Sequence, residues 1–244
     1  MRPIRRGEIP LSAPYKEYSD ARADLVSRLG RYCSYCEREI ATVLAVEHIQ
    51  PKGLPAYAHL ELEWSNFLLA CVNCNSTKKD KDVVLLDVLL PDRDNTLVPF
   101  KYSDSGSIEI NANVLGTPLE AKAKKIINLT GLDKRYSKVV DSNGNAVSLD
   151  RISQRIEALG EARHALGLYD AQPTNEMAEM IIMLAKAKGY FSIWYQVFEG
   201  VPKVLRQLVV AFPGTSASGC FSGANAEIIV PSPNPDGLPC GGKA

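Results

Sequence analysis

The residues best suited to chemistry lie between positions 33 and 78, and two Cys pairs stand out first. Cys33 and Cys36 form one CxxC motif, Cys71 and Cys74 form a second, and 34 residues separate the pairs. A CxxC turn presents two thiolates to one ion, and Zn²⁺ prefers four such ligands in a tetrahedron. Such a site has no open position. The spacing therefore predicts a structural zinc ion.

The alternative for these four residues is a set of buried thiols or disulfides. The sequence shows no secretory signal, so we expect a cytoplasmic protein, where lasting disulfides are rare. Zinc is therefore the preferred interpretation. Cys220 and Cys240 lie outside any CxxC motif and are assigned to no metal.

The segments around the cysteines predict two strands and a helix. Residues 44–46 are apolar and lead into Glu47 and His48, and residues 67–70 form a second apolar run that ends at the second CxxC motif. The polar run 75–79 can begin a helix. The expected order is strand, long loop, strand and helix, with zinc joining the first CxxC turn to the start of the helix.

In this order the segment resembles the HNH, or ββα-metal, endonucleases. The matching residues are Glu47, His48, Trp64, Asn66, Cys71-Val72-Asn73-Cys74-Asn75 and Lys78. The resemblance implies that His48 is the general base and that Glu47 and Asn75 hold one divalent metal ion. It also implies that Asn66 fixes the loop and that Lys78 contacts phosphate. Glu47 replaces the commoner Asp, and Asn75 stands where many members have His, but both keep an oxygen ligand suited to Mg²⁺.

Phosphodiester hydrolysis requires the two functions that these residues could provide. One is a deprotonated water beside phosphorus, and the other is charge neutralisation at the leaving oxygen. A neutral imidazole and a Mg²⁺ or Mn²⁺ ion supply them. Neighbours on a regular strand point to opposite faces, so Glu47 and His48 can share a site only where the strand ends. Pro51 and Gly53 favour such an ending.

Composition describes an ordinary globular protein. The 244 residues are 45% hydrophobic and 23% charged, with a formal net charge of zero. Residues 1–81 carry 12 Lys and Arg against 10 Asp and Glu, so there is no broad basic field for nucleic acid. No apolar run approaches the ~20 residues of a membrane span. His59 and His164 have no motif around them and are interpreted as ordinary residues.

Other segments before residue 115 have weaker signals. The first ten residues, with three Arg and two Pro, predict a solvated extended arm, with phosphate contact as the alternative. Ser19 and Gly30 bound a predicted helix. Residues 51–63 predict a loop without a regular element, covering one side of the site. Residues 98–111 predict a β-hairpin.

Asp92 and Asp94 pose a separate choice. Two acidic residues this close suggest a second metal site, but Asp and Asn beside Pro are also common turn residues, and a turn is the preferred interpretation.

From residue 117 the pattern becomes helical. Thr117-Pro118-Leu119-Glu120 combines a capping box with Pro at the first helical position. Helical spacing then predicts core packing at Ile152, Ile156 and Leu159, at Met177, Ile181 and Leu184, at Phe191, Trp194 and Phe198, and at Val204, Leu208 and Phe212. Met177, Met180 and Met183 are interpreted as core fillers.

Together these patterns predict an α+β protein. We expect a zinc-stapled ββα-metal nuclease core within residues 1–115, a helical domain at 116–212, and a Gly-, Ser- and Pro-rich, partly mobile tail at 213–244. An MRPI start and an HNH core with a helical extension resemble the HNH effectors of bacterial anti-phage defence operons such as Septu and Zorya. That resemblance implies cleavage of DNA and a protein partner, a sensor or ATPase subunit. The alternative is a non-catalytic zinc-binding adaptor for DNA or protein.

Overall fold

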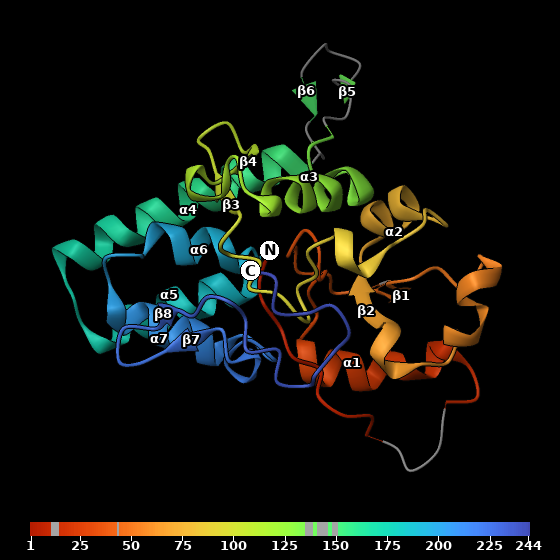
Figure 1. The fold of residues 1–244 in the computed structure, drawn as a ribbon. Coiled ribbons are helices and arrows are strands. Elements are labelled where there is room, and N and C mark those ends of the chain that lie inside the picture. Colours follow the sequence, from red (N-terminus) through yellow and green to blue (C-terminus); the bar gives the residue numbers. More distant parts are fainter. Residues whose placement is uncertain (11–14, 43, 135–138, 141–145, 148–150) are drawn as a thin grey trace.

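The computed structural model describes residues 1–10, 15–42, 44–134, 139–140, 146–147 and 151–244. It is an α+β fold in which helices are combined with small two-stranded sheets, as the sequence predicts. Figure 1 shows two parts side by side, one around β1, β2 and α2 and the other built from helices α4 to α7. Helix α3 lies above the first part, and both ends of the chain lie between the two parts.

The first part contains the expected strand–strand–helix unit. Strand β1 (Ala45–His48) pairs antiparallel with β2 (Phe67–Ala70), with His48 opposite Phe67. Helix α2 (Val72–Lys78) follows at once. It begins three residues before the predicted start, because the backbone N–H of Cys74 is capped by the sulfur of Cys71.

Burial explains the position of the two strands. All four residues of β2 are completely buried, so this strand is apolar on both faces and packs against helix α1 (Arg22–Leu29). Gly30 ends α1 with a φ of 75°, as predicted, but the 3₁₀ turn before it (Tyr18–Ala21) is capped by Glu17 and not by Ser19. The connection between the strands also differs from the prediction, because it contains 3₁₀ helices at Pro55–Leu60 and Trp64–Asn66.

The predicted hairpin and the capped helix after it are confirmed. Strands β3 (Phe100–Tyr102) and β4 (Ile108–Ile110) pair antiparallel. Helix α3 (Pro118–Thr130) begins at Pro118, and its cap is the Thr117 side chain, which accepts a hydrogen bond from the backbone N–H of Leu119.

The second part is helical, as predicted. After the short strands β5 (Val139–Val140) and β6 (Ala146–Val147) come α4 (Arg151–Ala171), α5 (Asn175–Lys188), α6 (Phe191–Val197) and α7 (Pro202–Ala211). Trp194 is completely buried at their centre. The prediction of core packing is wrong for four residues, because Met180, Met183, Leu184 and Ile156 are 61%, 64%, 42% and 45% exposed.

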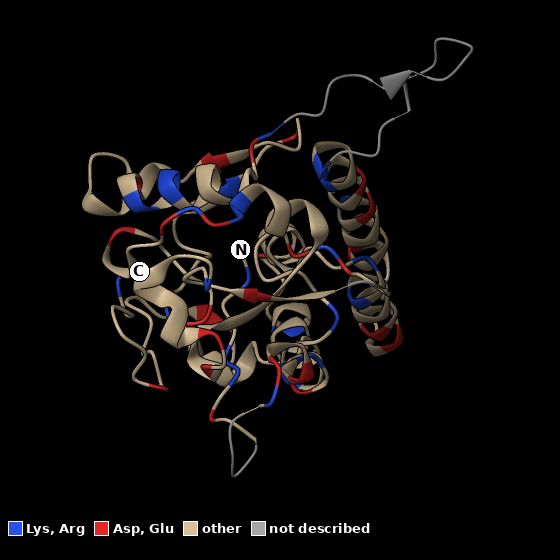
Figure 2. Cartoon of the chain, turned by 90° about the vertical axis from the view of Figure 1, so that its right-hand side faces the viewer, with Lys and Arg blue, Asp and Glu red and all other residues tan. Residues whose placement is uncertain are grey.

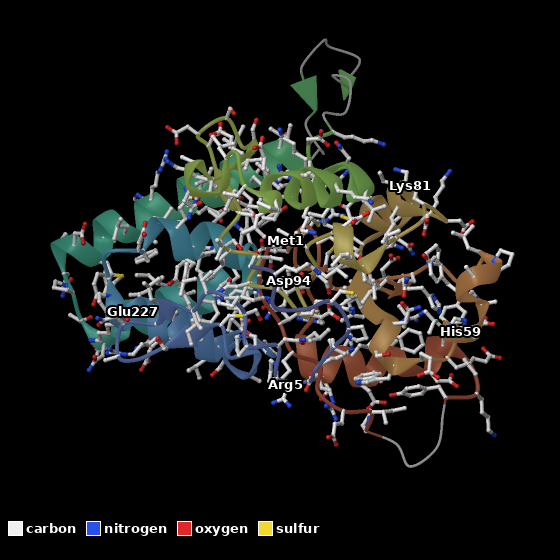
Figure 3. All side chains as sticks on the ribbon, in the orientation of Figure 1. Met1, Arg5, His59, Lys81, Asp94 and Glu227 are labelled. Atoms are coloured by element: carbon white, nitrogen blue, oxygen red, sulfur yellow. The ribbon has the colours of Figure 1, made fainter. Side chains whose placement is uncertain are left out.

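The predicted solvated arm is also wrong. Arg2 and Arg6 are 3% and 2% exposed, and Arg6 forms a 2.8 Å ion pair with Asp92. Residues 91–94 form a turn, as expected, and the carboxylates of Asp92 and Asp94 are paired with cations, Asp94 with Lys243. Figure 3 shows Met1 and Asp94 in the middle of the molecule. The arm is therefore part of the core.

Residues 213–244 pack along both parts. They include strands β7 (Phe221–Ser222) and β8 (Glu227–Ile228), and Asn95 donates from Nδ2 to the carbonyl oxygen of Ile229 at 2.9 Å. Cys220 is buried and Cys240 is exposed, and both are free thiols. The boundaries 1–115, 116–212 and 213–244 and the partial mobility of the tail stay predictions.

Candidate functional site

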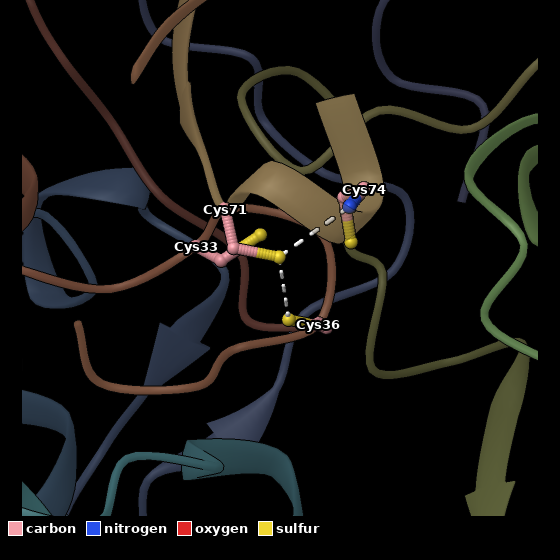
Figure 4. Close-up of side chains that lie close together, drawn as sticks. All are labelled: Cys33, Cys36, Cys71 and Cys74. Carbon is pink, nitrogen blue, oxygen red and sulfur yellow. Dashed lines mark hydrogen bonds between the residues drawn. The ribbon is translucent and has the colours of Figure 1, made fainter. Parts of the chain in front are cut away.

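The four cysteines of the two CxxC motifs meet at one point. Their sulfur atoms all lie within 4.8 Å of one another, and all four residues are buried (Figure 4). Tetrahedral zinc with Zn–S bonds of about 2.3 Å separates its sulfurs by about 3.8 Å. The distance between the sulfurs of Cys36 and Cys71 is 3.7 Å. The cluster therefore suits a structural zinc ion.

Local backbone geometry prepares both pairs of thiols for a shared ion. The first pair sits on a tight turn in which the N–H of Glu37 donates to the carbonyl oxygen of Cys33 at 2.9 Å. The second pair spans the first turn of α2, where the N–H of Cys74 donates to the sulfur of Cys71 at 3.4 Å. Hydrogen bonds from the neighbouring thiols, that of Cys33 first, lower the pKa of Cys71 far below its usual range. A lowered thiol pKa favours the thiolate, which is the form that binds metal.

A second group of residues lines a pocket of about 200 Å³ at the end of β1. Its lining is formed by Tyr18, Val46, Glu47, His48, Pro51, Lys52, Asn75, Lys79 and Asp80. Glu47 and His48 are neighbours on a strand, yet both reach this pocket because β1 ends at His48. Three of the residues singled out from the sequence, Glu47, His48 and Asn75, are thus brought together.

The ring of His48 is held by contacts that define its protonation. Its Nε2 lies 2.9 Å from the carbonyl oxygen of Glu61, which can only accept, so Nε2 carries the proton and Nδ1 keeps a free lone pair. Tyr18 and Phe67 pack against the ring with centroid distances of 4.9 and 5.2 Å. Burial lowers the pKa of His48 below its usual value, which favours the neutral imidazole.

Glu47 is fixed by an internal cation. The ammonium of Lys78 lies 2.8 Å from Oε1 of Glu47 and donates to the carbonyl oxygen of His48 at 2.7 Å. Tyr35 donates weakly to the same Oε1, at 3.4 Å. Burial raises the pKa of Glu47, and the charge of Lys78 opposes that rise. Within the described residues, the polar contacts of the Glu47 carboxylate fall on Oε1, which leaves Oε2 for a further ligand.

Lys78 itself is not on the surface. It is 1% exposed, so a bound phosphate could not reach its ammonium without a rearrangement of α2. Lys79 is exposed and lines the pocket, and Lys81 lies at the outer edge of the molecule (Figure 3). His59 is also at this edge, outside the pocket residues.

Asn66 closes the loop that joins β1 to β2. Its Oδ1 accepts from the N–H of Gln50 at 2.8 Å, and its Nδ2 donates to the carbonyl oxygen of Gln50 at 2.9 Å. The backbone oxygen of Asn66 accepts from the N–H of Ile49. These bonds hold the chain immediately after His48.

Sequence reasoning missed three residues of the pocket. Tyr18 precedes the first helix, Lys52 follows the strand, and Asp80 lies beyond α2. Lys52 sits over the ring of Tyr18 at 4.2 Å and pairs with Glu61. None of the three belongs to a motif. Only Asp80 lies close to the motif, two residues after Lys78, and that position could have suggested that it lines the pocket.

Comparison with known proteins agrees with this geometry. The site combines a ββα unit, four cysteines that could hold one zinc ion, and a His at the end of the first strand, which is the arrangement of a ββα-metal site. Residues 33–81 match the sequence model of the HNH endonuclease family. A comparison of the chain with curated proteins gives no match. Residues 33–81 are therefore similar to HNH endonuclease domains, and the four-Cys cluster within them fits a zinc-containing form of that fold.

The helices were compared with the length and apolarity of a membrane span. None of those in the described ranges combines the length and the apolarity that crossing a bilayer demands.

Proposed function

We propose that this protein is a metal-dependent HNH endonuclease that hydrolyses DNA phosphodiester bonds. The observation that carries the proposal is the unprotonated Nδ1 of a neutral His48 in the same pocket as Glu47 and Asn75. A base and two oxygen ligands in one pocket match the needs of phosphodiester hydrolysis.

In this proposal each residue has a separate task. His48 accepts a proton from the attacking water at Nδ1, and its bond to the Glu61 carbonyl keeps that nitrogen directed at the substrate. Glu47, through Oε2, and Asn75 hold the catalytic metal ion. When bound, Mg²⁺ or Mn²⁺ neutralises charge at the leaving oxygen. Asn66 positions the loop after His48.

We reassign the phosphate contact that the sequence suggested for Lys78. Its buried ammonium holds Glu47 and the His48 backbone, so it is a positioning residue. The exposed Lys79 beside the pocket is the better candidate for a phosphate contact.

Replacement of the base tests this function. His48→Ala should lower plasmid cleavage in Mg²⁺ or Mn²⁺ by at least ~10²-fold, the lower range for a general base, with no loss of zinc. His59→Ala is the matched control, because His59 is exposed and does not line the pocket, and it should cleave at the wild-type rate. Wild-type cleavage by His48→Ala would reject the assignment.

The alternative function is a non-catalytic zinc-binding adaptor for DNA or protein. One observation favours it, since the Glu47 carboxylate is already paired with Lys78. In an adaptor, the pocket would bind no second metal ion. Wild-type chain that shows no cleavage in Mg²⁺ or Mn²⁺ beyond that in EDTA, alone or with its operon neighbours, would favour the adaptor.

For the cellular role we propose a cytoplasmic effector of a bacterial anti-phage defence system. The resemblance to Septu and Zorya effectors supports it, as does the large helical part outside the matched segment. We propose that this part docks a sensor or ATPase subunit. Loss of phage protection in cells that carry His48→Ala, with the rest of the operon intact, is the expected result.

A further inference from the structure

The first residue of α4 lies against the four-Cys cluster, although it is far outside the segment that matches the HNH family. Arg151 is completely buried, and its Nη1 donates to the sulfur of Cys74 at 3.3 Å and to the carbonyl oxygen of Thr130 at 3.1 Å. In the part of the chain that the structure describes, its Nε and Nη2 have no hydrogen-bond partner.

A buried guanidinium needs a nearby negative charge. Arg stays protonated in proteins, and an unpaired buried cation is costly. Among the described residues, the guanidinium of Arg151 contacts one sulfur and one carbonyl oxygen, and of these two partners Cys74 is the one that can become anionic. Four thiolates around one divalent ion carry a net negative charge, which a guanidinium at 3.3 Å offsets.

The sulfurs of Cys71 and Cys74 accept hydrogen bonds from different parts of the molecule. The sulfur of Cys71 accepts a backbone N–H of α2, as zinc-bound thiolates often do, so its support comes from within the ββα unit. Cys74 takes its N–H donor from the helical part of the molecule instead. The helical part thus supplies one of the outer contacts of the metal centre.

A second junction joins the same two parts. The carboxylate of Glu37, next to Cys36, accepts from the N–H of Ser192 at 2.8 Å, and its backbone oxygen accepts from the N–H of Tyr190 at 2.9 Å. Gly189 has a φ of 79°, and a Cβ there would lie 2.6 Å from the Glu37 oxygen. Both CxxC motifs are therefore anchored to the helices, one through Glu37 and the other through Arg151.

We propose that Arg151 is a positioning residue of the zinc centre. It donates a hydrogen bond from Nη1 to the metal-bound thiolate of Cys74 and offsets the negative charge of the four thiolates. The zinc site is then completed by helix α4 and binds its ion more tightly when the helical part is docked. This inference does not rest on nuclease activity and applies equally to an adaptor.

The experiment compares two arginines of the same helix. Arg155 lies one turn after Arg151 and is equally buried, but its guanidinium donates to the carbonyl oxygens of Gly106 and Leu132 and not to a cysteine. In the full chain, Arg151→Gln should weaken zinc binding by about 10- to 100-fold, the usual effect of losing an outer-shell partner. Arg155→Gln should lower stability but leave zinc affinity unchanged. Zinc affinity is measured by competition with a chromogenic chelator.

Cobalt substitution gives a second, spectroscopic readout. The sulfur-to-cobalt charge-transfer band of the Co²⁺-loaded chain should shift in Arg151→Gln and stay in place in Arg155→Gln. Equal zinc affinity and an unshifted band in Arg151→Gln would overturn the proposal, and so would an equal loss of zinc affinity in both variants.

Arg151→Lys keeps the test open if Arg151→Gln does not fold. It retains the charge, but the ammonium of the shorter, flexible lysine side chain cannot reproduce the position of the Arg151 Nη1 between Cys74 and Thr130. Zinc affinity below that of the wild type, with a shifted cobalt band, supports the hydrogen bond. Wild-type affinity with an unshifted band contradicts it.

Discussion

The ammonium of Lys78 satisfies two acceptors at once, the Glu47 carboxylate and the carbonyl oxygen of His48. Both belong to the end of β1, so a single side chain from α2 sets the position of that strand end relative to the helix. Because Lys78 and Glu47 are 1% and 3% exposed, the pair is shielded from solvent, and removal of one partner leaves a buried charge.

Lys78→Met should therefore destabilise the protein by about 3 kcal/mol or more, since it strands the Glu47 carboxylate in the interior. Urea unfolding measures the change. Lys81→Met is the control, because Lys81 is exposed, and its effect should stay within about 0.5 kcal/mol. Adding Glu47→Gln to Lys78→Met should restore part of the lost stability. Equal unfolding midpoints for wild type and Lys78→Met would show that the pair does not form.

The sequence identified most residues of this site but did not show where each side chain lies in the structure. Glu47, His48 and Asn75 were recognisable because the family motif fixes their spacing. Lys78 looked exposed in a polar run, although it lies four residues after Cys74 and therefore on the same buried face of a helix. Helical phase could have corrected that assignment. The bond from His48 to Glu61 could not be predicted, because it depends on how a loop folds back.

At the scale of elements, the ends of helices were predicted correctly where the signal lay in a few neighbouring residues. Thr117 before Pro118 predicted the start of α3, and Gly30 predicted the end of α1. The exposed Met180 and Met183 show the limit of periodicity, because an apolar helical stripe does not reveal which part of it a neighbour covers. That information lies in the packing of α5 against α4, α6 and α7.

Variants of two adjacent residues of α2 distinguish the structural zinc ion from the proposed catalytic metal ion. Cys74→Ser removes a thiolate from the cluster and should release zinc and unfold the ββα unit, because metal binding contributes to folding. Asn75→Ala, one residue later on the pocket side, should keep one zinc ion per chain and lose Mg²⁺-dependent cleavage. Elemental analysis and circular dichroism measure these outcomes. A full zinc content in Cys74→Ser would contradict a site with four thiolates.

At the scale of the whole molecule, long-range ion pairs tie the first residues into the core. Arg6 and Arg93 both contact the Asp92 carboxylate, with distances of 2.8 and 2.9 Å to Oδ2. The sequence predicted a solvated arm because three Arg near a terminus resemble an exposed segment. The partner of Arg6 lies 86 residues further along the chain, and no local pattern reports such a contact.

Asp92 makes the free energy of unfolding depend on pH in the acidic range. Burial raises the pKa of Asp92, but Arg93 and Arg6 outweigh it and lower the pKa to about 2. A carboxyl with a depressed folded-state pKa contributes stability above its unfolded value near 3.9 and loses it as pH falls toward 2. This shift contributes roughly 2.5 kcal/mol to the free energy of unfolding at neutral pH.

Asp92→Asn should remove this part of the acid-side decline and also lower stability at pH 7, because two buried guanidinium groups lose their anion. The free energy of unfolding, measured by urea titration between about pH 2 and pH 7, tests both effects. Asp87→Asn is the control, because Asp87 forms an exposed pair with Lys125 and should leave the profile nearly unchanged. An unaltered acid-side slope in Asp92→Asn would contradict the depressed pKa.

The charge distribution predicts that the isolated chain engages DNA weakly. Non-specific affinity for duplex DNA comes mainly from Lys and Arg that neutralise phosphates, and it is low when few such contacts form. The formal net charge is zero, and Figure 2 shows Lys and Arg interspersed with Asp and Glu. Near the site, Lys78 is buried, and Lys124 and Lys125 of α3 already pair with Glu120 and Asp87. Lys79 and Lys81 are exposed but cannot hold a duplex alone.

A partner that supplies DNA contacts should therefore raise both affinity and cleavage. Binding and cutting of linear and plasmid DNA are measured at about 0.15 M salt for the isolated chain and for the chain co-expressed with its operon neighbours. We expect weak binding and slow cutting by the chain alone, and a gain in both for the complex. The His48→Ala complex should bind DNA as tightly as the wild-type complex without cutting it, which separates engagement from catalysis. Tight binding and rapid cutting by the isolated chain would rule out dependence on a partner, because the few exposed lysines beside the pocket would then suffice.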